Sequence, residues 1–333
     1  MAKVLVSEEN LINIANAIRE KSESTDSYKP SEMVTAIQNI SGEDSELEAS
    51  FISRINNTEG ANITKLPSEI TSIRKKAFYN HKDVVLTELP DGITKIGENA
   101  FSGCTNLAPI ELPNGLINIG SEAFSNCAKL ALTKLPSGLT SIGENAFNGC
   151  SNLALTELPN GITKIGIGVF KNCTNLALTK LPSSITNLSS QAFYGCANLA
   201  LAELPSNITS ISDSVFVDCK NLALTELPSG ITSLSMGVFK NCINLNNLNI
   251  IGLMTSIYSN VFNGCTNLTK ISFPNITNVI SLLSATAFSS TPIANGTGYI
   301  YVPDILVDSF KSATNWSTYA DQIKPISELE VSA

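Results

Sequence analysis

The stretch from Asn152 to Cys173, NLALTELPNGITKIGIGVFKNC, decides the fold. Its landmarks recur every 23 residues over most of the chain. Phenylalanine keeps this interval without insertion or deletion at Phe78, Phe101, Phe124, Phe147, Phe170, Phe193, Phe216, Phe239 and Phe262. A fixed period of this length is the signature of a solenoid, in which each repeat forms one coil and buries its apolar side against its neighbours.

Proline and cysteine follow the same period. The prolines occur at Pro67, Pro90, Pro113, Pro136, Pro159, Pro182, Pro205 and Pro228, then Ile251 takes the position before the series returns at Pro274. All eight cysteines lie three residues after a phenylalanine, at Cys104, Cys127, Cys150, Cys173, Cys196, Cys219, Cys242 and Cys265. His81 holds this position in the first coil.

The apolar positions of one coil can be assigned from this period. Leu153 and Leu158 predict a short strand, which Pro159 ends because proline cannot donate a hydrogen bond to a strand ladder. One strand per coil predicts a parallel ladder with strands about 4.8 Å apart. Ile162 and Ile165 are expected to point inward, as is the phenylalanine. The sequence therefore predicts an α/β repeat fold, a solenoid of about ten coils.

A glycine follows most of the prolines after one intervening residue, as Gly161 follows Pro159. This position suits a turn residue with positive φ, and asparagine is the substitute that such a conformation tolerates best. The series is Gly92, Gly115, Gly138, Gly161 and Gly230, with Ser184 and Asn207 as replacements. Ser184 fits the expectation less well.

The segment from Leu107 to Leu130, LAPIELPNGLINIGSEAFSNCAKL, matches the pattern LxxIxLPxxLxxIGxxAFxxCxxL. The pattern resembles the BspA-like class of bacterial leucine-rich repeats over roughly residues 62–290. This resemblance implies a leucine-rich-repeat solenoid, and it implies a surface or secreted protein of adhesion and recognition. Most coils depart from the pattern by placing a threonine, such as Thr156, where the class has an inward isoleucine such as Ile110. We expect the strand to bulge there and to bury Leu155 instead.

Residues 1–43 lack the repeat and predict a small helical hairpin, with one helix starting near Ser7 and a second opened by Pro30. The string NLINIANAIREKSESTDSYKPSEMVTAIQNI resembles a module at the front of tail-associated and other structural proteins of phages and prophages of Gram-positive bacteria. This resemblance implies docking, and the candidate docking residues are Leu11, Ile14, Ile18, Tyr28, Met33 and Ile37. The alternative is that the hairpin is only an N-terminal cap.

The two ends of the solenoid need covering. Residues 44–61 predict a linker helix that caps the first coil. At the other end, a step of 26 residues from Phe262 to Phe288 indicates a three-residue insertion after Ile280. The four expected parts are a docking module at 1–43, a cap helix at 44–61, the solenoid at 62–290 and a C-terminal cap at 291–333.

The expected C-terminal cap resembles the one that recurs on BspA-like repeat proteins, including phage-encoded ones. Its segment GYIYVPDILVDSFKSATNWSTYADQIKPISEL predicts a last strand from Tyr299 to Val302 and a helix from Asp304. A loop anchored by Trp316 and Tyr319 is expected to follow.

The regular cysteines predict buried thiols rather than disulfides or a metal centre. Side chains that point the same way in a stacked file suit a disulfide dihedral poorly, and a single file cannot offer four tetrahedral ligands. A nucleophilic site would have to be built on the one histidine, His81, whose place in the first coil has a simpler structural explanation. We therefore expect no enzyme, no cofactor and no metal site.

The charge balance and hydropathy exclude two classes of partner. A formal net charge of −8 and few clustered basic residues argue against nucleic acid. The chain has no run of about eighteen apolar residues and no basic and apolar leader at its start, so neither membrane insertion nor a signal peptide is indicated.

One outward position of each predicted strand forms the candidate recognition face. Its residues are Glu88, Glu111, Lys134, Glu157, Lys180, Glu203 and Glu226, and the file continues as Asn249 and Ser272. The alternation of charge in the middle of the file favours pairing between neighbouring coils over a concentrated ligand-binding charge. If the solenoid recognises a ligand, this face is nevertheless the expected surface, because solenoids bind through one position of every coil.

Two functions follow as hypotheses. The first is a non-enzymatic virion structural protein, tail-associated or fibre-like and made in the host cytoplasm. In that case residues 1–43 dock to other virion proteins and the solenoid contacts a host cell-surface protein or glycan. The alternative is a bacterial surface or secreted adhesin that binds host glycoprotein or matrix ligands. Association into a homo-oligomer is left open.

Overall fold

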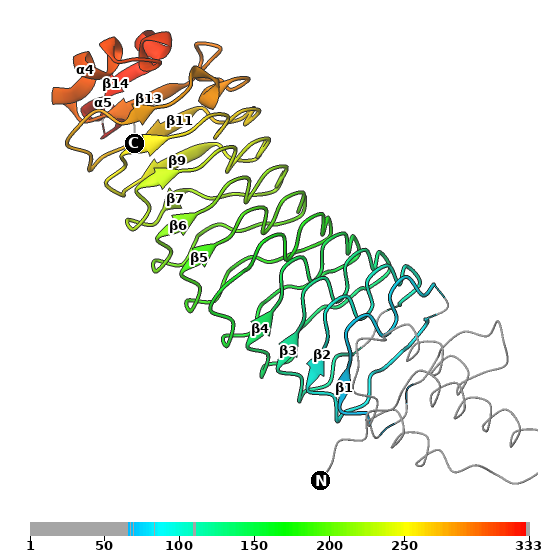
Figure 1. The fold of residues 1–333 in the computed structure, drawn as a ribbon. Helices are drawn as coiled ribbons and strands as arrows, with labels where there is room; N and C mark the ends of the chain where they lie inside the picture. The colour runs from blue at the N-terminus through cyan, green and yellow to red at the C-terminus, as the bar shows by residue number, and fades with distance from the viewer. Residues whose placement is uncertain (1–65, 67, 69, 83, 109–110, 331–333) are drawn as a thin grey trace, which may run out of the picture.

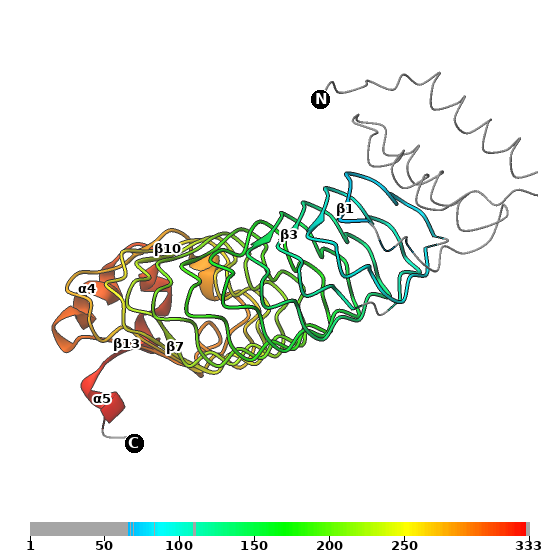
Figure 2. The ribbon, with the colours of Figure 1, turned by 90° about the horizontal axis from the view of Figure 1, so that it is seen from below.

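The computed structural model describes residues 66, 68, 70–82, 84–108 and 111–330. Over these residues the chain winds into one elongated stack of coils, with its helices at the C-terminal end (Figure 1). Figure 2 shows the same coils stacked along a single axis. The predicted solenoid fold is therefore confirmed. The predictions for residues 1–43 and 44–61 concern segments outside the described residues.

Most coils contribute a short strand at the second isoleucine of the repeat. We call the set of these paired strands the Ile ladder. Each strand pairs in parallel with the strand one coil away, as Ile73 pairs with Ile96 and Ile96 with Ile119. The strands are β1 (Ser72–Ile73), β2 (Lys95–Ile96), β3 (Asn118–Ile119), β4 (Ser141–Ile142), β5 (Asn187–Leu188), β6 (Ser210–Ile211), β8 (Ser233–Leu234), β10 (Ser256–Ile257) and β12 (Ser281–Leu282). They form three sheets, β1-β2-β3-β4, β5-β6 and β12-β10-β8.

A second ladder, the Leu-Pro ladder, lies at the segment before the proline position, where the sequence places the strands. It is a five-stranded sheet with the order β14-β13-β11-β9-β7. Its strands are β7 (Glu226–Leu227), β9 (Asn247–Ile250), β11 (Lys270–Ser272), β13 (Tyr299–Val302) and β14 (Ile323–Pro325). The predicted strand position is thus right for the C-terminal coils, and the Ile ladder was not predicted.

In the central coils, the predicted strand around Leu153 and Leu158 is wrong. Leu155 and Leu158 are buried, while Thr156 and Glu157 both face solvent. Two consecutive outward residues break the alternation that a regular strand requires. The expected burial of Leu155 in place of the threonine is confirmed. Contact between coils is kept by isolated main-chain bonds, such as the 3.0 Å bond from the Ala154 amide to the Leu132 carbonyl.

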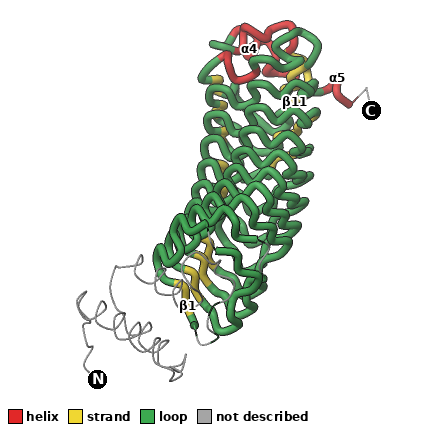
Figure 3. The backbone as a smooth tube through the Cα atoms, turned by 90° about the vertical axis from the view of Figure 1, so that its right-hand side faces the viewer, coloured by secondary structure: helices red, strands yellow, loops and turns green. Residues whose placement is uncertain are grey.

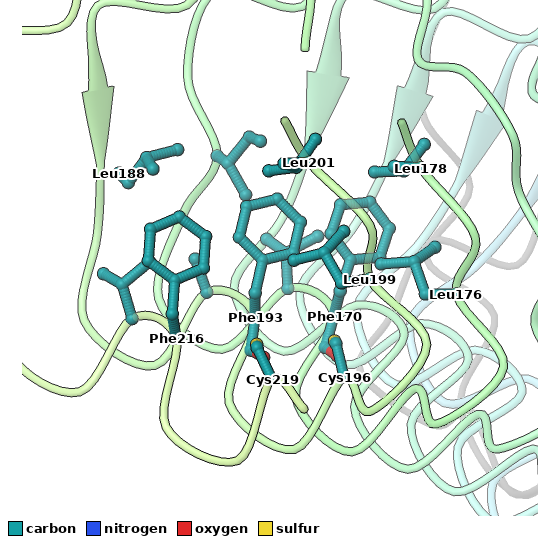
Figure 4. Packing of buried hydrophobic residues seen from close by; sticks show 14 of the residues in the cluster. Phe170, Leu176, Leu178, Leu188, Phe193, Cys196, Leu199, Leu201, Phe216 and Cys219 are labelled. Carbon is teal, nitrogen blue, oxygen red and sulfur yellow. The ribbon is translucent and has the colours of Figure 1, made fainter. Parts of the chain in front are cut away.

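The core consists of files of identical side chains that run along the stack (Figure 4). From Phe78 to Phe262, successive phenylalanine rings have centroids 5.1 to 5.9 Å apart and lie within 12° of parallel. Ile162 and Ile165 are buried as predicted. Because each ring is covered by its two neighbours, stability comes from stacking rather than from any single coil.

The turn glycines differ from the prediction, because none of the residues in the series at Gly161 has positive φ. A Cβ atom on Gly161 would lie 3.0 Å from the Leu139 carbonyl oxygen of the preceding coil, so close approach explains glycine there. Where serine replaces glycine, the Ser184 hydroxyl donates to the Ile162 carbonyl at 2.6 Å. Two other positions of the coil have positive φ. One is the series Asn80, Gly103, Asn126, Gly149, Asn172, Gly195, Asp218, Asn241 and Gly264, and the other is the series Lys76, Asn99, Glu122, Asn145, Gly168, Gln191, Ser214, Gly237 and Asn260.

The stack ends in a compact cap (Figure 3). Its helices are η1 (Ala285–Phe288), η2 (Asp304–Leu306), α4 (Val307–Ser312), η3 (Trp316–Gln322) and α5 (Ser327–Glu330). The predicted strand from Tyr299 to Val302 is confirmed as β13. The predicted loop at Trp316 and Tyr319 is wrong, because both residues lie in η3 and β14 follows. A 3₁₀-helix is too short to show a periodic pattern in the sequence.

The insertion near the cap begins earlier than predicted. Ile257 in β10 pairs with Leu282 in β12, a separation of 25 residues instead of 23. Two of the three extra residues therefore precede β12 rather than following Ile280. Trp316 fixes this segment, because its indole Nε1 donates to the Ile280 carbonyl at 2.6 Å.

Candidate recognition surface

The predicted recognition residues lie along one side of the stack, which we call the Leu-Pro face. It comprises the exposed side of the Leu-Pro ladder and the equivalent segments of the earlier coils. All seven predicted residues, Glu88, Glu111, Lys134, Glu157, Lys180, Glu203 and Glu226, are exposed. A parallel bridge joins Glu88 to Glu111 at one end, and Glu226 pairs in register with Asn249 at the other. The structure therefore assembles them into one file.

The C-terminal part of the file is held by hydrogen bonds between coils. The Ser272 hydroxyl donates to Asn249 Oδ1 at 2.8 Å, and Asn249 Nδ2 donates to Glu226 Oε2 at 2.9 Å. Both the hydroxyl and the amide are thereby satisfied within the protein. This part of the file is polar but already internally paired.

The charges in the middle of the file do not pair as the sequence predicts. Among the described residues, no ion pair within 4.0 Å joins Lys134 or Lys180 to a glutamate of the neighbouring coils. Exposed ion pairs gain little in water, since the cost of ordering two long side chains offsets their attraction. Within the described part of the chain, Lys134 and Lys180 are therefore exposed without an ion pair to a neighbouring coil.

Three open hollows lie on this same face. The largest, about 600 Å³, is lined by Glu88, Glu111, Lys134 and Glu157 together with neighbouring backbone and leucine side chains. A second, of about 280 Å³, adjoins it and shares Glu88. A third, of about 550 Å³, contains Glu203 and Glu226. Six of the seven predicted residues therefore line a hollow, and Lys180 is the exception.

The C-terminal end of the face holds residues that the sequence analysis did not single out. Tyr299 and Tyr301 project from β13, between Lys270 on β11 and Lys324 on β14. Their alternation with two buried residues, Ile300 and Val302, was the signal that could have placed both tyrosines outward.

The cysteines are structural, as predicted. All eight are free and buried. Burial raises the pKa of the Cys150 and Cys265 thiols to about 12. A thiol that keeps its proton is a poor nucleophile and a poor metal ligand. The sequence predicted that these thiols are buried but did not predict the hydrogen bonds that they donate.

The other candidates for chemistry are also accounted for within the described part of the chain. His81 occupies the cysteine position of the first coil, and its amide donates to the Phe78 carbonyl at 3.1 Å, as each cysteine amide does to its own phenylalanine. Among these residues, no group of three or more His, Cys, Asp or Glu side chains is placed to hold a metal ion. None of the helices here has the length and apolar character needed to span a bilayer.

The candidate docking residues Leu11, Ile14, Ile18, Tyr28, Met33 and Ile37 lie outside the described residues. Docking through residues 1–43 therefore stays a prediction.

The comparison with protein families gives one match. The family described as "BspA type Leucine rich repeat region (6 copies)" matches residues 71–200 and 188–316. The two segments together span residues 71–316, which is most of the chain. No curated protein is significantly similar to the chain.

Several solved structures are similar to the chain. A leucine-rich cell surface protein from Faecalibacterium prausnitzii A2-165 is 24% identical, with 76% of this chain and 86% of that chain covered and a TM-score of 0.39. The pneumococcal vaccine antigen PcpA is 16% identical, with 81% and 89% covered and a TM-score of 0.47. A leucine-rich repeat protein from Bacteroides ovatus ATCC 8483 is 20% identical, with 81% and 92% covered and a TM-score of 0.34.

Proposed function

We propose a recognition function from one premise: the chain belongs to the family of BspA-type leucine-rich repeat proteins. In this proposal it is a non-enzymatic adhesin of a bacterial surface or of the secreted fraction, and it binds host glycoprotein or matrix ligands. The Leu-Pro face is the binding surface.

The observation that carries the proposal is the coincidence of exposed charge and hollows on one face. Each coil contributes one outward residue to the file, and six of the seven predicted residues line a hollow. Neighbouring solenoid coils present such residues at a regular spacing, which suits an extended ligand. The buried files of phenylalanine, leucine and cysteine leave the interior without a role in binding.

A non-enzymatic role fits the chemistry of the described residues. The thiols are buried and protonated, and the exposed carboxylates of the file are not grouped with a base or a nucleophile. Family membership supports a surface or secreted location, since proteins with these repeats are typically found there. The virion hypothesis depends on residues 1–43 and stays a prediction.

The test compares two variants of the full-length chain that lose the same charges from different sides. The first replaces Glu111, Lys134, Glu157 and Lys180 with serine on the Leu-Pro face. The control replaces Lys95, Glu98, Glu144 and Lys164 with serine; these residues are exposed and lie on or just after the Ile ladder. Both variants therefore lose two carboxylates and two ammonium groups.

Retention of each labelled protein is measured on immobilised matrix glycoproteins and on host cells. We expect the Leu-Pro variant to bind at least about tenfold more weakly than the unsubstituted chain, and the control variant to bind within about twofold of it. Equal losses in both variants, or no retention of the unsubstituted chain, would overturn the proposal. Circular dichroism establishes that both variants are folded.

A further inference from the structure

A pair of tyrosines and a pair of lysines form a distinct surface at the C-terminal end of the Leu-Pro face. We call Lys270, Tyr299, Tyr301 and Lys324 the Tyr-Lys platform. In the sheet register, Lys270 pairs with Tyr299, and Tyr301 pairs with Lys324. All four side chains are thus on the same side of three consecutive strands, β11, β13 and β14. These strands lie at the C-terminal end of the stack (Figure 1).

The side chains of the platform hold each other in a crossed arrangement. The Lys270 ammonium lies 5.9 Å from the ring centroid of Tyr301, which is diagonal to it, and the Lys324 ammonium lies 5.8 Å from that of Tyr299. The two rings meet edge to face at 6.4 Å. Each ammonium is therefore positioned by a cation–π contact, while its N–H groups remain able to bind an anion.

The charge of the platform is opposite to that of the rest of the face. The largest hollow, near the other end, is lined by Glu88, Asp91, Glu111 and Glu157 against the single lysine Lys134. The platform instead brings two lysines together in a chain whose net charge is −8. The Glu328 carboxylate lies near Tyr301 and offsets one of these two charges, so the platform keeps a net positive charge. An acidic ligand would be repelled by the hollow and attracted to the platform.

Donor groups next to the lysines add to this preference. Asn247 is exposed and pairs in register with Lys270, so its side chain lies on the same side of the sheet as the platform, on the next strand. The Tyr301 hydroxyl remains a donor at neutral pH, because burial, and after it the nearby Glu328 and Tyr299, raises its pKa above the usual value. The platform thus offers ammonium, hydroxyl and amide donors around two aromatic rings.

We propose that the Tyr-Lys platform binds an acidic polysaccharide, with its carboxylate or sulfate groups on Lys270 and Lys324 and its sugar rings against Tyr299 and Tyr301. The two lysines lie two strands apart and are offset by two residues along the strands, so their Cα atoms are about 12 Å apart by the usual strand spacing and rise, a span comparable to a disaccharide. This inference names a ligand for the C-terminal end of the Leu-Pro face. It rests on the proposed recognition function only for its biological setting, because the platform itself is argued from its own side chains.

The features of the platform favour a sugar over an acidic peptide. A peptide is usually held by an exposed strand edge or by pockets for its side chains. The platform side chains lie on the outward side of the sheet rather than along the edge of its last strand, β14, and none of the three hollows includes these residues. Aromatic rings bordered by fixed polar donors suit a chain of sugars, whose rings carry both apolar C–H faces and hydroxyl groups.

The experiment measures binding of the full-length chain to four immobilised polymers: polygalacturonate, heparin, neutral dextran and poly-L-glutamate. The test variant is Lys270→Gln with Lys324→Gln, and a second variant is Tyr299→Ala with Tyr301→Ala. The matched control is Lys95→Gln with Lys164→Gln, which removes the same charge from exposed positions at the Ile ladder, outside the Leu-Pro face.

We expect binding to polygalacturonate, to heparin or to both, with neither dextran nor poly-L-glutamate retained comparably. Polygalacturonate alone would indicate carboxylated sugars, and heparin alone would indicate sulfated sugars. The Lys270/Lys324 variant should bind at least about tenfold more weakly, and the tyrosine variant should also weaken. The Lys95/Lys164 control should stay within about twofold of the unsubstituted chain.

Three results would overturn the inference: no binding to either acidic polysaccharide, an equal loss in the control variant, or equal affinity for poly-L-glutamate. The last result would indicate an acidic protein partner instead. Retention on matrix glycoproteins and cells distinguishes this inference from the broader function. If the full-length chain is retained on matrix glycoproteins or cells but binds neither polygalacturonate nor heparin, only the assignment of an acidic polysaccharide is wrong.

Discussion

The thiol of Cys196 donates a hydrogen bond to the main-chain carbonyl oxygen of Phe170, one coil earlier, at a Sγ–O distance of 2.9 Å. The same oxygen accepts the amide of Cys173 in its own coil at 3.1 Å. Every cysteine makes the equivalent thiol bond, at 2.9 to 3.1 Å. The cysteine file therefore joins each coil to the one before it, in addition to filling space beside the phenylalanines.

Substitutions at Cys196 separate these two roles. Cys196→Ala removes both the sulfur volume and the donor, and we expect it to lower the free energy of unfolding by about 1–2 kcal/mol. Cys196→Ser retains a donor at nearly the same place and should be destabilised less than the alanine variant. Urea denaturation followed by circular dichroism measures both changes.

If the thiol served only as a small hydrophobic group, the order would reverse. A buried hydroxyl without a partner is more costly than a methyl group, so serine would then be the less stable variant. Equal stability of all three proteins would also contradict the assigned hydrogen bond.

The buried thiols predict a loss of stability in alkali. Burial raises the pKa of Cys150 and Cys265 from 9.0 to about 12. The folded chain then keeps these protons above pH 9, while the unfolded chain releases them, so this stabilisation is complete below pH 9 and falls as pH rises. The expected slope is about 1.4 kcal/mol per pH unit for each such thiol.

Urea midpoints measured from neutral pH to about pH 10.5 provide the test. A variant with Cys150→Ala and Cys265→Ala should show a shallower decline above pH 9 than the unsubstituted chain. Parallel declines in the two proteins would show that these thiols do not cause the alkaline sensitivity.

The files of buried side chains could be predicted from the sequence because one residue type recurs at one position of every coil. Phe170, Cys173 and Ile165 are placed correctly for this reason. The Ile ladder could not be found in this way, because two-residue strands show no alternation. The repeat pattern places Thr156 next to the outward Glu157. We nevertheless predicted a regular strand there, and two consecutive outward residues do not allow one.

The backbone conformations were harder to predict than the burial. Glycine in the Gly161 series suggested positive φ, yet that glycine avoids a neighbouring carbonyl instead. The two positions that do have positive φ are held by several residue types, mainly asparagine and glycine at the one and lysine, glutamate, glutamine and serine among others at the other, so no single residue type marks either. The outward file at Glu157 followed directly from the repeat, whereas Tyr299 and Tyr301 lie in the cap, where the repeat has ended.

Glycine substitutions test the assigned backbone positions. Gly149 has φ +76°, and a Cβ atom there would lie 2.6 Å from Asn126 Oδ1. We expect Gly149→Ala to lower the free energy of unfolding by about 1–2 kcal/mol, since an L-residue is strained in this conformation. Gly138 lacks positive φ, and its Cβ would lie 3.7 Å from the Asn114 carbonyl oxygen.

Gly138→Ala is therefore the matched control, and it should be neutral or stabilising by up to about 1 kcal/mol. Thermal and urea unfolding compare the two variants. A Gly138→Ala variant that is as unstable as Gly149→Ala would mean that the two turn positions have been assigned wrongly.

The C-terminal cap offers a separate test through its single tryptophan. Trp316 is buried, packs against Phe310 with ring centroids 5.0 Å apart, and donates its indole N–H to the Ile280 carbonyl. Trp316→Phe leaves this carbonyl without its indole donor, and we expect a loss of about 1–3 kcal/mol in the stability of the cap. Amide hydrogen exchange should rise first in the cap. Uniform exchange along the whole stack would instead indicate that the cap and coils unfold as one unit.

The central claim is that recognition takes place on the Leu-Pro face, and carboxylate footprinting tests it most directly. The full-length chain is labelled with a carbodiimide and an amine, free and bound to matrix glycoprotein, and modified residues are quantified by mass spectrometry. The account predicts that labelling of Glu111, Glu157 and Glu203 falls on binding, while that of Glu98 and Glu144 near the Ile ladder is unchanged. Protection of Glu98 and Glu144, with Glu111, Glu157 and Glu203 still fully labelled, would contradict it.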